Sequence, residues 1–334
     1  MTSILVESSD TDDGSNEAIQ ITNLADGSEV TIDNDNDFSG SNSGYDAAGE
    51  LTLEDDSGGS NSVSLGFTGN GDVILGAALE IGEVEELSLS SESALEVQGA
   101  FLEDDSPTTT KVLEDLTLSG GDIELDSDNG ATLFDSEELV IDASGASTLT
   151  IDADGTVLGS NSTGDTLEIT SGDGNDTIDV SAYTNTEVTV TGAGGNDPIA
   201  TGGGADVIDA GDGNNTITAN AGDDEITIGD GNDTINYATG TDGSDTINGF
   251  EVGSSGDVYD TDFAPTTTDL TTVDVASTDG DITLGTDSSK TGGISEITGE
   301  LQSTPTDFSD GQQVIDAIVG EGNTLKVDAT TEQG

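Results

Sequence analysis

The chain has 334 residues, of which 71 are acidic and only 3 are basic, so its formal charge at pH 7 is −68. It contains no cysteine, histidine or tryptophan, which excludes a disulfide framework, a Ser-His-Asp triad and a zinc site built on those ligands. Nucleic acid is excluded as a partner, because phosphate contacts need clustered lysine and arginine. Charge of this density opposes compaction, so the chain is either disordered or completed by bound cations.

The N-terminus predicts a chain that is either cytosolic or exported by a route that ignores the N-terminus. Residues 1–10 have no basic segment, and their apolar run is limited to Ile4–Val6, which is not a secretory signal peptide. No stretch of the chain approaches the roughly 18 consecutive apolar residues needed to span a bilayer. We therefore expect no membrane insertion.

Residues 1–170 are predicted to form a β-rich N-terminal region. Short alternating triplets such as Leu116–Leu118, Leu139–Ile141 and Leu149–Ile151 are bounded by Gly, Asp, Asn or Ser, which favour turns. Many short strands joined by polar turns are typical of a sandwich, a barrel or a stacked solenoid. The scarcity of large side chains favours the narrow solenoid. Whether this region coils continuously with the residues that follow is left open.

Residues 171–249 contain a repeat of nine residues. Position four is Gly and position eight is Ile in all seven windows, and position six is Asp in all but one, which has Asn215. The five windows from residue 192 to residue 236 are contiguous. Twelve residues separate the first window from the second, and three residues separate the sixth from the seventh. In chain order, the windows are SGDGNDTID from Ser171, GAGGNDPIA from Gly192, TGGGADVID from Thr201, AGDGNNTIT from Ala210, ANAGDDEIT from Ala219, IGDGNDTIN from Ile228 and GTDGSDTIN from Gly240.

This period has a direct physical interpretation. Glycine permits tight turns, position eight buries one Ile in a short strand, and position six places one carboxylate in each turn. If each window is half a coil, windows two apart stack, with parallel strands about 4.8 Å apart. One edge then carries Asp197, Asn215 and Asp233. The other edge carries Asp206 and Asp224, followed by Asp245 if a three-residue insertion loops out.

The repeat resembles the calcium-binding nonapeptide G-G-x-G-x-D-x-U-x of the repeats-in-toxin (RTX) family. The resemblance covers about a quarter of the chain and implies an all-β, parallel β-roll over 171–249. It also implies several Ca²⁺ ions, which take six to eight oxygen ligands, held by turn carboxylates and glycine carbonyls. The predicted metal ligands are Asp173, Asp176, Gly194, Asp197, Gly203, Asp206, Gly213, Asn215, Gly222, Asp224, Gly231, Asp233 and Asp245.

One predicted ligand, Asn215, is neutral, and the acids of the set have an alternative interpretation. Asn215 offers a neutral oxygen where the repeat expects a charge, so we expect weaker cation binding on its edge. The alternative for all of these acids is a set of solvent-facing turn residues that bind no specific ion.

Residues 250–334 are predicted to form a C-terminal region for capping, assembly or secretion. A strand is expected around Ile282–Leu284 and one helix from about Ser309 to Val319, where Ser309 is the N-cap. RTX proteins resemble cargo of one-step export machines that read an uncleaved C-terminal signal. The resemblance therefore implies an extracellular or cell-surface location.

Four functions are compatible with these observations. The first is a self-assembling structural protein, such as a surface-layer or matrix-filament subunit, folded and cross-linked by Ca²⁺ and partnered by its own copies. The second is a calcium-dependent adhesin that binds cell-surface polysaccharide, although the absence of Trp opposes a sugar-stacking platform. The third is a module of an RTX exoenzyme, and the fourth is a pore-forming toxin. We expect the first, and we assign no catalytic residue.

Overall fold

The fold was examined in a computed structural model of the whole chain. The part of the chain that the structure describes consists of residues 3–7, 28–33, 53–54, 62–69, 72–75, 79–82, 84–97, 101–102, 113–126, 138–152, 164–237, 245–251, 257–261, 271–277, 282–284, 294–299 and 325–327. The chain divides into two compact units, Met1–Ala182 and Tyr183–Gly334.

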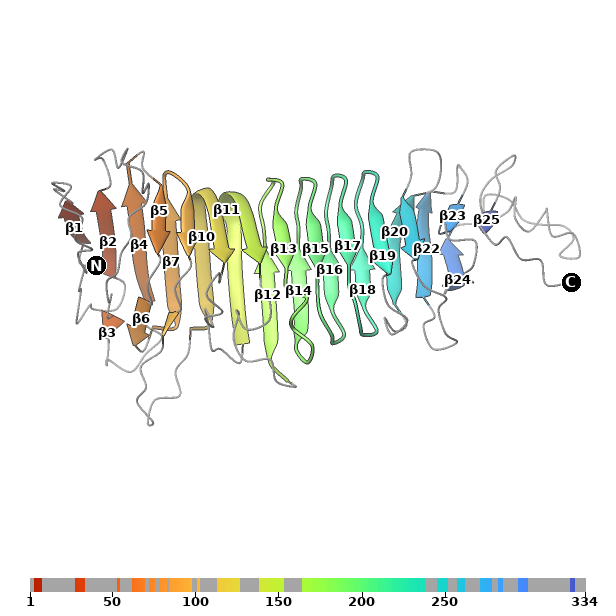
Figure 1. The fold of residues 1–334 in the computed structure, drawn as a ribbon, viewed down its shortest axis with the longest axis horizontal. Coiled ribbons are helices and arrows are strands. Elements are labelled where there is room, and N and C mark those ends of the chain that lie inside the picture. The colour runs from red at the N-terminus through yellow and green to blue at the C-terminus, as the bar shows by residue number, and fades with distance from the viewer. Residues whose placement is uncertain are drawn as a thin grey trace, which may run out of the picture. The chain divides into compact units, whose positions relative to one another are not determined.

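The N-terminal unit consists of parallel strands stacked as successive rungs (Figure 1). Its strands are β1 (Ser3–Glu7), β2 (Ser28–Asp33), β3 (Leu53–Glu54), β4 (Ser62–Thr68), β5 (Val73–Leu75), β6 (Leu79–Gly82), β7 (Glu86–Ser91), β8 (Leu95–Val97), β9 (Phe101–Leu102), β10 (Asp115–Asp126), β11 (Glu138–Asp152), β12 (Thr166–Thr170) and β13 (Thr177–Asp179). One ladder runs β1–β2–β4–β7–β10–β11–β12, and a second runs β5–β8–β10–β11–β13.

Strand β10 takes part in both ladders because it changes direction in its middle. Its first half pairs with β7 up to Gly120, and its second half pairs with β8 from Ile123. Gly120 has φ of +107°, and a Cβ at this position would collide with the Ser91 carbonyl of the neighbouring rung. Glycine is therefore required at this bend, both for its backbone angle and for the close approach.

The C-terminal unit is a second parallel stack, in which strands alternate between two ladders. Its strands are β14 (Glu187–Thr191), β15 (Pro198–Ala200), β16 (Val207–Asp209), β17 (Thr216–Thr218), β18 (Glu225–Thr227), β19 (Thr234–Tyr237), β20 (Thr246–Glu251), β21 (Val258–Thr261), β22 (Thr271–Ser277), β23 (Ile282–Leu284), β24 (Ile294–Gly299) and β25 (Leu325–Val327). Even-numbered strands pair with even-numbered strands, and odd-numbered strands pair with odd-numbered strands.

The register confirms the predicted stacking of windows two apart. Ile199 of β15 pairs with Ile217 of β17, and Ile208 of β16 pairs with Ile226 of β18, each over 18 residues. The all-β parallel solenoid predicted from the nine-residue period is therefore confirmed. Within residues 171–237 and 245–249, the strands are three to six residues long, and glycine-rich turns link those of residues 171–237.

Apolar side chains from facing strands fill the interior of the coils. The isoleucine at position eight is at most 1% exposed in every window. Complete burial of one such side chain stabilises a fold by about 1.5 to 3 kcal/mol. These residues are Ile178, Ile199, Ile208, Ile217, Ile226, Ile235 and Ile247.

The predicted C-terminal helix at about 309–319 lies outside the described residues. Within the described ranges every regular element is a strand. Within these ranges, no helix has the length and apolar character required to cross a bilayer.

The close approach of coils at position four predicts that a side chain there destabilises the fold. A Cβ at Gly213, where φ is +131°, would collide with the Gly195 carbonyl oxygen of the adjacent coil. We expect Gly213→Ala to combine about 1 to 2 kcal/mol of backbone strain with a further overpacking cost of about 1 to 3 kcal/mol. The measurement is the thermal unfolding midpoint in excess calcium, followed by circular dichroism.

Gly164→Ala is the matched control. Gly164 also has positive φ, at +109°, but a Cβ there would meet nothing within 4 Å. The Gly164→Ala variant should therefore lose only the stability that corresponds to the backbone strain. Equal losses of stability in the two variants would contradict the close approach of neighbouring turns.

Candidate metal-binding turns

The residues at position six of the repeats are buried, although all but one carry a carboxylate. Each is at most 2% exposed. Carboxylates in such surroundings need hydrogen bonds or a bound cation to offset the loss of water. The residues are Asp176, Asp197, Asp206, Asn215, Asp224, Asp233 and Asp245.

The even-numbered strands carry one ladder of these side chains, which we call edge B. The Oδ1 atom of Asp206 accepts a hydrogen bond from the Val188 N–H at 2.9 Å. The Asp206 N–H donates to Asp224 Oδ1 at 2.8 Å, and the Asp224 N–H donates to Asp245 Oδ1 at 3.0 Å. Each carboxylate thus forms a hydrogen bond with the backbone of the preceding coil on this edge. Val188 occupies the register of position six, so edge B begins with an apolar residue.

The odd-numbered strands carry the other ladder, which we call edge A. The Asp197 N–H donates to Asn215 Oδ1 at 3.0 Å, and the Asn215 N–H donates to Asp233 Oδ1 at 2.7 Å. The Asp233 N–H then donates to Asp257 Oδ1 at 2.9 Å. The structure therefore assembles both predicted ladders and adds Asp257 to edge A.

Asp257 was missed by the sequence pattern for a clear reason. It aligns with position six because the β19–β21 register pairs Ile235 with Tyr259. Its window has Ser255 at position four and Tyr259 at position eight, and it follows Asp233 by 24 residues instead of 18. The usable signal was the Asp followed two residues later by a large apolar side chain.

Asp224 illustrates the state of a position-six carboxylate that has accepted its backbone hydrogen bond. Its Oδ1 accepts the Asp206 N–H, whereas its Oδ2 is buried without a hydrogen-bond partner. Burial is the main cause that raises the pKa of Asp224 to about 8. The Asp206 N–H lowers this pKa, and the negative charges of Asp245, Asp206 and Asp223 raise it. A cation beside Oδ2 would remove the cost of holding this group ionised.

Asp206 follows the same pattern. Burial raises its pKa above the usual value, and the Val188 N–H bond lowers it. The negative charge of Glu187 raises it further. The chain has only three basic residues to set against its 71 acidic ones, namely Lys111, Lys290 and Lys326.

Position-four glycines allow a carbonyl oxygen of the preceding coil to approach the carboxylate of their own window. A Cβ on Gly222 would lie 2.6 Å from Asp224 Oδ1 and would collide with the Gly204 carbonyl oxygen. A Cβ on Gly204 would lie 2.5 Å from the Thr186 carbonyl oxygen and 3.3 Å from Asp206 Oδ1. The missing side chain therefore lets a carbonyl oxygen of one coil and a carboxylate of the next lie close together.

The predicted glycine ligands separate into two groups. Gly213, Gly222 and Gly231 hold position four, and each faces a carbonyl oxygen of the preceding coil on its edge. Gly194 and Gly203 hold position three, where they form isolated parallel bridges with Asp212 and Ala221. Their position-four equivalents are Gly195 and Gly204, which the prediction did not include. The invariance of position four was the signal that should have selected them.

The first window lies in the N-terminal unit. Asp176 is buried, and its Oδ1 accepts the Leu149 N–H at 2.6 Å. Asp173, three residues earlier, is exposed on the turn. A Cβ on Gly174 would lie 3.3 Å from Asp176 Oδ1 and would collide with the Ser147 carbonyl. Asp176 therefore has the same surroundings as the ladder carboxylates, whereas Asp173 does not.

The donor set is composed of oxygen and suits a hard cation. Within the described ranges no three acidic side chains gather at one point, so any ion must take many of its ligands from backbone carbonyls. Calcium accepts carboxylate and carbonyl oxygens together in flexible geometry, whereas magnesium demands near-ideal octahedral sites. The turns therefore fit calcium better than magnesium.

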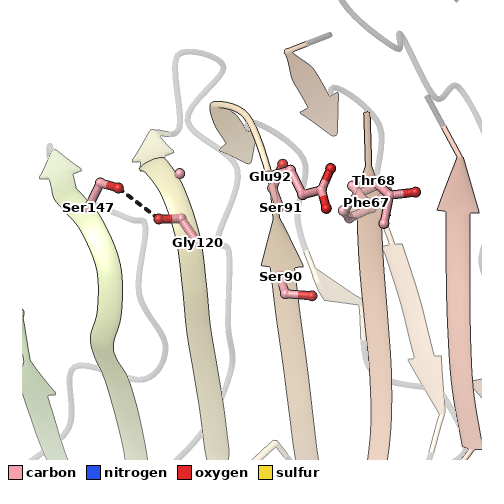
Figure 2. A pocket seen from close by; sticks show the side chains of 8 residues that line it. Phe67, Thr68, Ser90, Ser91, Glu92, Gly120 and Ser147 are labelled. Atoms are coloured by element: carbon pink, nitrogen blue, oxygen red, sulfur yellow. Dashed lines mark hydrogen bonds between the residues drawn. The ribbon is translucent and has the colours of Figure 1, made fainter. Parts of the chain in front are cut away.

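A separate hollow of about 430 Å³ lies in the N-terminal unit (Figure 2). Its polar lining consists mainly of hydroxyl groups, and Glu92 is the one lining residue that bears a carboxylate. Glu92 Oε2 accepts the Gly69 N–H at 3.0 Å, and Ser147 donates its hydroxyl to the Gly120 carbonyl at 2.8 Å. The lining thus lacks the pair of carboxylates that a glycosidase site requires.

Comparison with known families identifies the repeats. The family model of the RTX calcium-binding nonapeptide repeat (4 copies) matches residues 191–226 and 200–235. These residues are RTX calcium-binding repeats, and they contain β15 to β18 together with the central part of both ladders. No match was found among curated proteins or among solved structures.

The raised pKa of Asp224 predicts how the protein without divalent ions responds to pH. The folded-state pKa of about 8 exceeds the ordinary value of 3.8, so the folded state binds the proton more tightly. Its stabilising contribution is complete below about pH 4 and is lost as the pH rises through about 8. We expect the thermal midpoint of metal-free protein to fall over this range.

Two variants separate this effect from the general charge of the chain. Asp224→Asn should reduce the pH dependence, because it removes the buried titrating group. Asp223→Asn removes one charge at the adjacent exposed position and should leave most of the dependence in place. Identical pH profiles for wild type and Asp224→Asn would show that Asp224 ionises normally.

Proposed function

We propose that this protein is an extracellular structural protein, a subunit of a surface layer or matrix filament, whose folding and self-association depend on Ca²⁺. The observation that carries the proposal is parallel stacking in both units. Within the described ranges, every regular element is a strand, and the RTX repeats form part of the parallel stack of the C-terminal unit.

Stacked coils also provide a route to assembly. The terminal coil of any parallel solenoid presents backbone N–H and C=O groups on its outer edge, and such edges pair with other chains unless they are capped. Two copies of a chain with a formal charge of −68 repel each other strongly. Calcium bound between carboxylates lowers that repulsion, so the same ion would support both folding and association.

An extracellular location agrees with the repeats and with calcium chemistry. RTX repeats are typical of secreted proteins. A chain whose turns hold uncompensated carboxylates is poorly folded where calcium is scarce, and calcium becomes folding free energy where it is abundant. The chain would thus remain export-competent inside the cell and fold outside it.

Chelation should unfold the repeat region. In excess EGTA at neutral pH, we expect circular dichroism to lose β-signal from at least residues 171–249, and we expect added Ca²⁺ to restore it. The reason is that Asp206, Asp224 and their equivalents would be buried without a counter-charge. A spectrum that stays β-rich in EGTA would show that the coils do not need the ion.

Assembly is tested by negative-stain microscopy with and without millimolar Ca²⁺. Sheets or filaments that form with calcium and disperse in EGTA support the structural role. Folded monomers in calcium that bind cell-surface polysaccharide would support the adhesin instead. Monomers that neither assemble nor bind polysaccharide would contradict both.

A further inference from the structure

Asn215 differs from the other position-six residues in what its second terminal atom does. Its Oδ1 accepts the Asp197 N–H at 3.0 Å, as the carboxylates do for their neighbours. Its Nδ2 donates to the Gly211 carbonyl at 3.1 Å, within its own turn. This pairing fixes the orientation of the amide, because the oxygen meets a donor and the nitrogen meets an acceptor. The side chain is 1% exposed and neutral.

The carboxylate of Asp224 occupies the equivalent place on edge B. Its Oδ1 accepts the Asp206 N–H at 2.8 Å, but its Oδ2 is buried without a partner. Both terminal atoms of the Asn215 amide therefore form hydrogen bonds, whereas only one carboxylate oxygen of Asp224 does. The Asn215 Nδ2 group is only a donor, so it offers a cation no ligand where Asp224 offers a second carboxylate oxygen.

A second ladder on edge A strengthens the distinction. The residues at position five are Asn196, Asn214 and Asn232, which are exposed. Asn196 Oδ1 accepts bonds from Asn214 N at 2.7 Å and Nδ2 at 2.9 Å. Asn214 Oδ1 accepts the same pair from Asn232 at 3.0 Å and 3.1 Å. Edge B has Ala205 and Asp223 at this position, where no such amide ladder is built.

We propose that Asn215 is a cation-independent brace, which closes one turn of edge A by its amide and omits one calcium position from that ladder. The inference rests on the proposed calcium dependence of the other turns. Asp197 and Asp233, on either side of the brace, remain cation ligands. Because its turn is already satisfied, the coil around Asn215 forms at lower calcium than the coil around Asp224.

The brace provides one coil of the repeat region that orders before calcium binds. Adjacent coils support one another in a solenoid, so one coil that is stable without the ion lowers the cost of ordering its neighbours. The position-five amide ladder extends this support over three turns of the same edge. Edge B, in contrast, is completed by the ion.

Three variants of the full chain test the proposal, with Ca²⁺ as the only added ligand. Asn215→Asp should add about one bound calcium ion per chain and lower the thermal midpoint in EGTA, since it replaces a satisfied amide by a buried charge. Asp224→Asn should do the reverse, with loss of about one ion and a higher midpoint in EGTA. Asn214→Asp adds the same charge as Asn215→Asp at the exposed neighbouring position and should leave the calcium count unchanged.

The readouts are calcium stoichiometry by isothermal titration and the thermal midpoint in EGTA. If wild-type protein binds calcium but Asn215→Asp leaves the count unchanged, the brace is wrong while the proposed function stands. If Asn215→Asp and Asn214→Asp raise the calcium count equally, only surface charge is involved and the brace is again wrong. If Asn215→Asp fails to fold, Asp224→Asn decides, and an unchanged calcium count there overturns the proposal. Wild-type protein that binds no calcium would overturn the proposed function and the brace together.

Discussion

The structure depends on one hydrogen bond that recurs in every ladder step of the repeat region. A buried side-chain oxygen at position six accepts the backbone N–H of the preceding coil on its edge, as Asp224 does for Asp206 and Asp233 does for Asn215. This bond joins turns that strand pairing alone would leave loose. It also commits a series of carboxylates to the interior of a chain with almost no basic residues. Burial of this charge is the physical reason for the cation that we propose.

Glycine and isoleucine make this arrangement possible at such a short period. The strand part of each repeat is about three residues long, so one isoleucine supplies most of its apolar burial. The remaining six residues must turn and still approach the coil above and below. Position four achieves this approach only without a Cβ, and the absent side chain leaves room for carbonyl and carboxylate oxygens together. The gathering of these oxygen atoms and the tight coil therefore have the same cause.

The two edges of the C-terminal unit solve the same electrostatic problem differently. Edge B retains buried carboxylates at Asp206, Asp224 and Asp245, which we propose are balanced by bound cations. Edge A includes a neutral amide at Asn215 and an asparagine ladder beside it, which are satisfied within the chain. A protein that folds on meeting calcium benefits from both features. The amides give the coils an initial order, and the carboxylates make completion depend on the surroundings.

The sequence alone determined the solenoid, the half-coil of nine residues and the membership of both ladders from Asp197 to Asp245. It could do so because the period of Gly, Asp and Ile is local, and stacking follows from spacing. Three features required the tertiary structure. Asp257 joins edge A through strand register after an irregular step, Val188 takes the place of a carboxylate on edge B, and the amide of Asn215 turns toward Gly211. Each depends on which atoms of distant coils meet, and a residue pattern specifies the spacing of side chains but not the partners that their terminal atoms find.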